Sequence, residues 1–164
     1  MAIQVQFRRG TTSQHGSFTG VAGEVTVDTD KDTVIVHDGS QAGGFAIPNL
    51  KTAQEFTKTQ NFNATTLTDA STIAWDASAN QVTSVTLGAS RTLGAATNQI
   101  DGAVYVLTVI QDGSGSRVLS FNSNYKFTGG SAPTLTTTAA ARDILVFTSN
   151  GTNMFEIGRS LNVS

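Results

Sequence analysis

The sequence contains no cysteine, which excludes disulfide bonds and thiolate catalysis. It contains only two histidines, at positions 15 and 37, which leave little for a histidine metal site. Charged residues make up 13% of the chain, against about a quarter in an ordinary soluble domain. The formal net charge is −2, and Lys and Arg do not cluster, so phosphate neutralisation does not favour a nucleic-acid partner.

Long apolar runs are also absent. The longest run is far short of a membrane span, and residues 1–10 have no apolar core of the signal-peptide type. We therefore expect neither a membrane nor a nucleic acid among the partners. Instead the chain has 25 threonines, 15 serines and 38% hydrophobic residues, many of them Val, Ile and Phe. This composition is typical of an all-β protein.

Alternating apolar and polar residues predict three short strands in an N-terminal unit over residues 1–48. Residues 3–7 form the first, with Ile3, Val5 and Phe7 expected to face inward. The other two are residues 23–28 and the returning strand after an acidic turn. Three strands bury too little surface to be stable alone without disulfides or a metal. This unit should therefore oligomerise or dock on another domain.

The boundary between two domains is expected at residues 49–62, which form either a linker or a short helix. From residue 63 to 164 the pattern is all β, with short strands separated by Asp-Gly, Asn-Gly and Gly-rich turns. This spacing predicts a C-terminal β-sandwich of jelly-roll-like type. The predicted strands are residues 64–68, 72–75, 81–87, 102–111, 117–121, 124–127, 143–149 and 153–158.

Two of these strands, within residues 102–111 and 143–149, are apolar on both faces. In the first, one face carries Val104, Val106 and Ile110, and the opposite face is apolar as well. A sandwich strand usually buries one face and exposes the other. A third layer of the same chain or another subunit must cover the second face. Because the chain is too short for a third layer, we favour a second subunit.

No group of side chains predicts catalysis or a cofactor. The densest carboxylate cluster, at residues 28–38, begins like an EF-hand calcium loop. Counting from Asp28, however, Thr33 and Gly39 stand where such a loop needs Gly and Glu. We expect a solvated hairpin turn without a metal. The two histidines have no spacing that specifies a catalytic triad, so we predict no catalytic residue, no cofactor and no enzymatic activity.

Residues 7–45 resemble a known phage module. They contain Arg-Gly-Thr, then Gly-Glu-Val-Thr-Val-Asp-Thr-Asp at 23–30 and His-Asp-Gly-Ser at 37–40. This succession resembles the N-terminal domain of phage tail-fibre and major-tropism-determinant proteins. The resemblance implies a small β-prism-like unit over residues 1–48 that forms part of a homotrimer. His37 departs from the family, many members of which have Gly at this position.

Residues 63–158 resemble a second module, frequent at the C-termini of phage virion proteins. The matching runs include Thr-Ile-Ala-Trp-Asp at 72–76, Tyr-Val-Leu-Thr-Val-Ile-Gln-Asp at 105–112 and Gly-Gly-Ser-Ala-Pro-Thr-Leu at 129–135. Neither resemblance brings a catalytic residue. Together they imply a non-enzymatic bacteriophage virion structural protein.

Within that class we favour a trimeric capsid decoration protein, also called a cement or head-fibre protein. It would lie on the outer surface of the capsid, bound to the major capsid protein. The alternative is a short tail fibre or spike that binds a host-surface receptor, such as a polysaccharide. Arg8 or Arg9 would pair with carboxylates of the partner. Val104, Val106 and Ile110 would form the contact between subunits.

Overall fold

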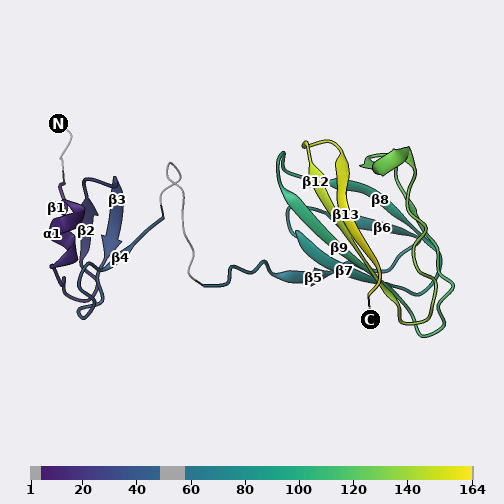
Figure 1. Cartoon of the computed structure of the whole chain (residues 1–164), viewed down its shortest axis with the longest axis horizontal. Coiled ribbons are helices and arrows are strands. Elements are labelled where there is room, and N and C mark those ends of the chain that lie inside the picture. The colour runs from purple at the N-terminus through teal and green to yellow at the C-terminus, as the bar shows by residue number, and fades with distance from the viewer. Residues whose placement is uncertain (1–4, 49–57, 164) are drawn as a thin grey trace. The chain divides into compact units, whose positions relative to one another are not determined.

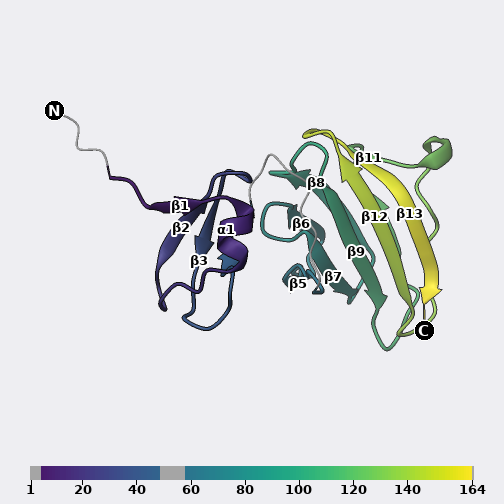
Figure 2. The same cartoon turned by 60° about the vertical axis from the view of Figure 1, so that its left-hand side comes forward.

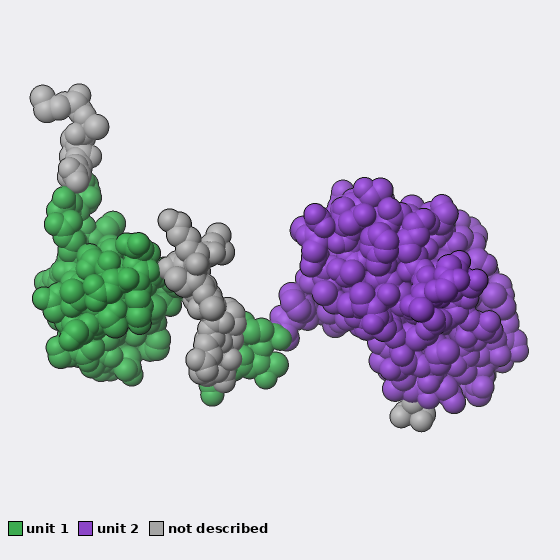
Figure 3. Space-filling view, turned by 45° about the horizontal axis from the view of Figure 1, so that its top comes forward, with its two compact units in different colours: residues 1–60 green, residues 61–164 purple. Residues whose placement is uncertain are grey.

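The computed structural model describes residues 5–48 and 58–163, and the chain divides into two compact units, residues 1–60 and 61–164 (Figures 1 and 3). Both units are built almost entirely from β-strands, as the composition predicts. Of the predicted linker or short helix at 49–62, residues 49–57 lie outside the described residues.

The N-terminal unit is one four-stranded sheet with the order β1-β2-β3-β4 and a short helix, α1, that lies over one of its faces (Figure 2). β1 pairs parallel with β2, and the other two pairs are antiparallel. The elements are β1 (Arg8–Gly10), α1 (Thr12–Gly16), β2 (Val25–Asp28), β3 (Thr33–Val36) and β4 (Phe45–Ala46).

A capping box begins α1. The Thr11 hydroxyl accepts from the Gln14 amide at 3.2 Å, and the Gln14 side-chain oxygen accepts from the Thr11 amide at 2.8 Å. Each side chain thus satisfies an N–H that has no partner inside the helix. The helix is only five residues long, so this cap and its packing on the sheet hold it in place.

The prediction of a strand at residues 3–7 is wrong. β1 begins at Arg8, Ile3 lies outside the described residues, and Val5 and Phe7 are 76% and 59% exposed rather than inward. The physical reason is that α1 and polar side chains fill the inner side of this sheet. Apart from Ile35, the apolar residues in and next to its strands therefore alternate outward.

The C-terminal unit contains two sheets that pack face to face. One has six strands in the order β11-β13-β12-β9-β7-β5, and the other has three in the order β10-β8-β6. A 3₁₀ turn at Thr128–Gly130 follows β11. The strands are β5 (Ala64–Thr66), β6 (Thr72–Asp76), β7 (Val82–Leu87), β8 (Arg91–Thr97), β9 (Val104–Gln111), β10 (Leu119–Phe121), β11 (Tyr125–Lys126), β12 (Arg142–Ser149) and β13 (Met154–Val163).

This sandwich is not a jelly roll, because most of its strand pairs are parallel. From β5 to β11 the chain alternates between the two sheets at every step, so neighbours within one sheet run in the same direction. Only β9–β12 and β12–β13 pair antiparallel in this unit. A jelly roll is built from antiparallel strands. The turn signals separate most of the strands, although residues 88–101 contain β8 (Arg91–Thr97), which was not predicted. Such signals do not specify to which sheet the chain returns.

Large aromatic side chains form the centre of the C-terminal core. Trp75 is 1% exposed, and its ring packs edge-on against Tyr105 and Phe147. The Trp75 indole N–H donates to the Asn80 carbonyl at 2.8 Å, and the Tyr105 hydroxyl accepts from the Ile100 amide at 2.8 Å. The polar ends of both rings are therefore satisfied inside the core, as buried aromatic residues require.

Candidate assembly surfaces

The N-terminal sheet presents an apolar surface on the face opposite α1. Residue pairing places Val27 beside Val34 in one row, and Val36 between Val25 and Phe45 in the next. Val34 and Val36 are each 37% exposed, and Phe45 is 56% exposed. We call these five residues the outer N-terminal face. Apolar patches of this kind mark interaction sites on soluble proteins.

The inner side of the same sheet is polar. Within residues 5–48, Ile35 is the only buried hydrophobic side chain. Its buried neighbours are His15, Thr26, Asp28, Thr33 and His37. A unit with so little apolar burial gains little stability from the hydrophobic effect. The outer N-terminal face is thus the larger apolar surface of this unit.

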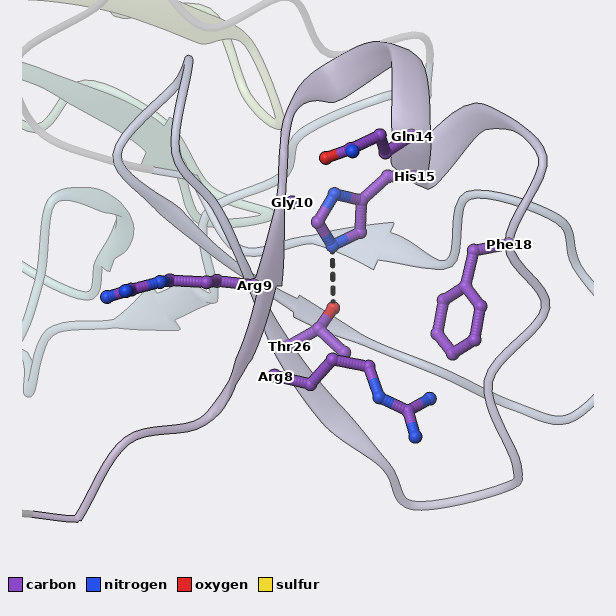
Figure 4. Close-up of a pocket in the computed structure, with 7 residues that line it drawn as sticks. All are labelled: Arg8, Arg9, Gly10, Gln14, His15, Phe18 and Thr26. Atoms are coloured by element: carbon purple, nitrogen blue, oxygen red, sulfur yellow. Dashed lines mark hydrogen bonds between the residues drawn. The ribbon is translucent and has the colours of Figure 1, made fainter.

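The two arginines predicted for an interface have different surroundings. The Arg8 guanidinium pairs with Glu24 at 2.8 Å and lies 5.0 Å from the centre of the Phe18 ring. Arg9 pairs across the sheet with Val27, is exposed, and forms no ion pair within residues 5–48 and 58–163. Both line a hollow of about 220 Å³ (Figure 4), together with Gly10, Gln14, His15, Phe18 and Thr26. Arg9 is therefore the more available of the two to a partner.

The acidic segment after β2 is a turn stabilised by its own carboxylate. Asp28 is buried and accepts from the amides of Asp30 and Lys31 and from the Thr12 hydroxyl. Burial alone raises the pKa of Asp28, but these hydrogen bonds outweigh it and hold that pKa below its ordinary value. No group of three His, Asp or Glu in the described residues could hold a metal ion.

The C-terminal unit also has an apolar outer face, on its six-stranded sheet. Residue pairing sets Val106 between Val82 and Val146, and Ile110 lies further along the same strand. Val104 is 45% exposed, while Val106 and Ile110 are half-buried. We call these five residues the outer C-terminal face. The opposite side of β9 is fully packed in the core, as expected for a strand with two apolar faces.

Sequence reasoning missed the outer N-terminal face, although a signal was present. In β2 and β3 the polar residues Thr26 and Thr33 lie inward, and the valines alternate with them. Assigning the apolar side to the interior is the ordinary rule, and it fails here because the interior is hydrogen-bonded. The alternation itself is visible in the sequence, but the side that is covered depends on His15 and His37, which are distant in sequence.

The two units resemble tail-fibre and major-tropism-determinant proteins of bacteriophages, as the motifs indicate. Residues 5–41 match the family described as the Major tropism determinant N-terminal domain. The Tail fiber receptor-binding protein of Bordetella phage BPP-1 is 39% identical to this chain over 155 residues. That alignment covers 88% of this chain and 36% of the relative, so the chain spans about a third of the relative's length.

The solved structures that match this chain in sequence are also major tropism determinants. The Major Tropism Determinant M1 Variant is 67% identical over 27% of this chain and 12% of that one, with a TM-score of 0.27. The P3c Variant is 28% identical over 93% of this chain and 31% of that one, with a TM-score of 0.29. Because these superpositions are poor, the resemblance rests on sequence.

These relatives favour the tail-fibre alternative over the capsid reading. The curated relative is named for a tail fibre, and neither it nor the matching family gives support to a decoration, cement or head-fibre protein or to a major-capsid-protein partner. The resemblance is thus to proteins of the virion, but not to its capsid surface. Separately, no helix within the described residues has the length and apolar character needed to cross a membrane.

Proposed function

We propose that this chain is a non-enzymatic structural protein of a bacteriophage tail, and that it assembles as a homotrimer through its two outer faces. The observation that supports assembly most strongly is the outer N-terminal face, which lies over an interior with one buried aliphatic side chain, Ile35. The resemblance to a tail-fibre receptor-binding protein supports the position in the tail.

The geometry favours a closed ring of copies over binding of an unrelated partner. The outer N-terminal face lacks acidic residues and repeats valine in two rows, so identical faces can pack against one another. Cyclic homo-oligomers are the usual way in which soluble proteins cover such a surface. Three copies agree with the resemblance to trimeric virion modules.

The outer C-terminal face supports the same assembly independently. Val104, Val106 and Ile110 would lie between subunits, and Arg9 would reach a carboxylate of the neighbouring copy. In a trimer each unit would then contribute a contact of its own between subunits. Repeated contacts on one chain increase the strength of assembly without a single strong site.

Paired substitutions on and off these faces test the proposal. Val36→Asp places a charge in the outer N-terminal face, whereas Val21→Asp adds the same charge at a loop residue that is 72% exposed. Val106→Asp and Val118→Asp form the corresponding pair in the C-terminal unit. Val118 is 57% exposed and lies outside the six-stranded sheet. We expect Val36→Asp and Val106→Asp to reduce the mass in light scattering, and the two controls to leave it unchanged. Equal masses for all four variants would contradict assembly through these faces.

The number of copies per virion distinguishes a tail protein from a capsid decoration protein. A tail protein is present in a small number of copies per particle, while a decoration protein approaches the copy number of the major capsid protein. Quantitative densitometry of purified virions should therefore give the low number. We also propose a host-surface receptor, with polysaccharide as the first class to test, through binding of the assembled protein to purified host glycan. A copy number near that of the capsid protein would refute the tail position without affecting the trimer.

A further inference from the structure

The two histidines of the chain lie in the interior of the N-terminal unit and are joined by one threonine. The Thr26 hydroxyl is 2.9 Å from His15 Nε2 and 2.9 Å from His37 Nε2 (Figure 4 shows the first contact). His15 and His37 are 6% and 2% exposed. Their rings are stacked with an interplanar angle of 12° and centres 6.4 Å apart.

The groups at the two ends of this chain of hydrogen bonds determine where each proton resides. The Gly20 amide donates to His37 Nδ1 at 3.3 Å, so that nitrogen must be an acceptor and the His37 proton lies on Nε2. His15 Nδ1 lies 3.0 Å from the Thr11 carbonyl, which can only accept, so the His15 proton lies on Nδ1.

These two assignments fix the direction of the two hydrogen bonds to the Thr26 hydroxyl. His37 Nε2–H donates to the Thr26 hydroxyl, and the Thr26 hydroxyl donates to the unprotonated Nε2 of His15. Every donor has one acceptor, and all five groups are satisfied. This holds for one arrangement only, in which both imidazoles are neutral and carry opposite tautomers.

The ring of His37 also has no room to move. A Cβ atom built on Gly20 would lie 2.6 Å from its Cγ, and one built on Gly44 would lie 2.7 Å from its Nδ1. Phe18 packs edge-on against the same ring at 5.2 Å. The ring therefore cannot rotate to find another partner for an added proton.

Protonation of either ring breaks the arrangement. A second proton on His37 would point Nδ1–H at the Gly20 N–H, so two donors would face each other. A second proton on His15 would leave the Thr26 hydroxyl between two donors, with its own proton unpaired. Two charged rings in contact would also repel each other.

The charged groups around the rings are already engaged. Glu24 beside Gly20 pairs with Arg8 and accepts from the Val21 amide. Asp28 is close enough to His15 to interact with it electrostatically, but the Asp28 oxygens accept from Thr12, Asp30 and Lys31. Asp38, next to His37 in the chain, accepts from the Ser40 and Gln41 amides. In the described structure no carboxylate forms a hydrogen bond to a ring nitrogen.

We infer that the Thr11–His15–Thr26–His37–Gly20 chain is an acid-sensitive lock, which holds the N-terminal unit closed only while both histidines are neutral. Closure should weaken as the pH falls below roughly 6.5, where free histidine charges. The C-terminal unit contains no histidine and should stay folded over that range. If both rings charge only after opening, the equilibrium constant for closure falls up to about 100-fold per pH unit.

Opening would also remove the outer N-terminal face, because the lock joins Thr26 of β2 to His37, which directly follows β3, and these two strands carry four of its valines. This consequence rests on the proposed function, whereas the lock itself does not. Local opening and loss of mass are measured separately, so failure of one leaves the other standing.

The lock is tested on the full chain with ¹⁵N-labelled histidine. At pH 7.5 we expect NMR to show His37 protonated at Nε2 and His15 at Nδ1. Lowering the pH should abolish amide protection in β2 and β3 while β9 and β12 stay protected. If both rings instead titrate with the N-terminal unit closed, or the tautomers differ, the inference is overturned.

Two variants of the bridging residue give an independent readout. Thr26→Ser keeps the hydroxyl and should retain both the tautomers and most of the amide protection in β3. Thr26→Val removes the hydroxyl at nearly constant volume and should lower that protection at pH 7.5. Thr83→Val, which removes a buried hydroxyl without a partner in the described structure, is the control in the other unit. Equal protection in the two Thr26 variants would show that the hydroxyl does not bridge the rings.

Discussion

Gly44→Ala is expected to destabilise the N-terminal unit far more than the same change at the neighbouring Gly43. Both residues have positive φ, 60° and 85°, so alanine meets the left-handed backbone penalty of roughly 1–2 kcal/mol at either position. At Gly44 the new Cβ would also lie 2.6 Å from Ile35 Cγ2 and 2.7 Å from His37 Nδ1. At Gly43 the nearest atom is 3.7 Å away.

The extra cost at Gly44 follows from overpacking, which is typically about 1–3 kcal/mol. Gly44→Ala should therefore cost about 2–5 kcal/mol in total, and Gly43→Ala about 1–2 kcal/mol. A unit of this size is stable by only a few kcal/mol, at about 0.05–0.15 kcal/mol per residue. Gly44→Ala should thus leave the unit largely open.

Hydrogen exchange is the suitable assay, because Trp75 and both tyrosines lie in the other unit and fluorescence does not report on this one. Amides of β2 and β3 should lose protection in Gly44→Ala and retain most of it in Gly43→Ala. Similar protection in the two variants would refute the close packing of the His37 ring between Gly20 and Gly44.

Three further predictions follow from the structure. Two concern the C-terminal unit, and one concerns the acidic turn after β2. Trp75→Ala should lower its free energy of unfolding by about 3–5 kcal/mol in urea, whereas Val118→Ala, at an exposed residue, should change it by less than about 0.5 kcal/mol. Hydrogen bonds from the Arg91 side chain lower the pKa of Asp69. That stabilisation is therefore present above the ordinary pKa and lost as the pH falls through the folded value, and Asp69→Asn should flatten the acid limb of stability below pH 4. Calorimetry with Ca²⁺ should show no saturable site at Asp28; a micromolar site would contradict the hairpin-turn account.

The strands that alternation predicted best are those whose apolar side faces a core. β7, β9 and β12 lie close to their expected ranges because Val, Leu and Phe alternate in them and pack in the sandwich. β8 was missed, since Gly94 and its alanines have weak strand propensity. Gly94 leaves room for close pairing there, because a Cβ atom would lie 3.1 Å from the Ile73 carbonyl of the paired strand, a tight contact.

The candidate surfaces were only partly predictable for a related reason. The second apolar face of β9 follows from residues of one strand, so Val104, Val106 and Ile110 could be named. The outer N-terminal face depends on which side of β2 and β3 is covered, and that is decided by the Thr26 bridge between two histidines distant in sequence. Pairing across turns and loops carries no local signal.

The mass of the full chain in solution tests the central claim most directly. One chain weighs 17.1 kDa, so assembly through the outer faces predicts a species of three times that mass in sedimentation equilibrium at micromolar concentration. The apparent stability of the N-terminal unit should then rise with protein concentration. A species of 17.1 kDa with a fully protected N-terminal unit would contradict the account.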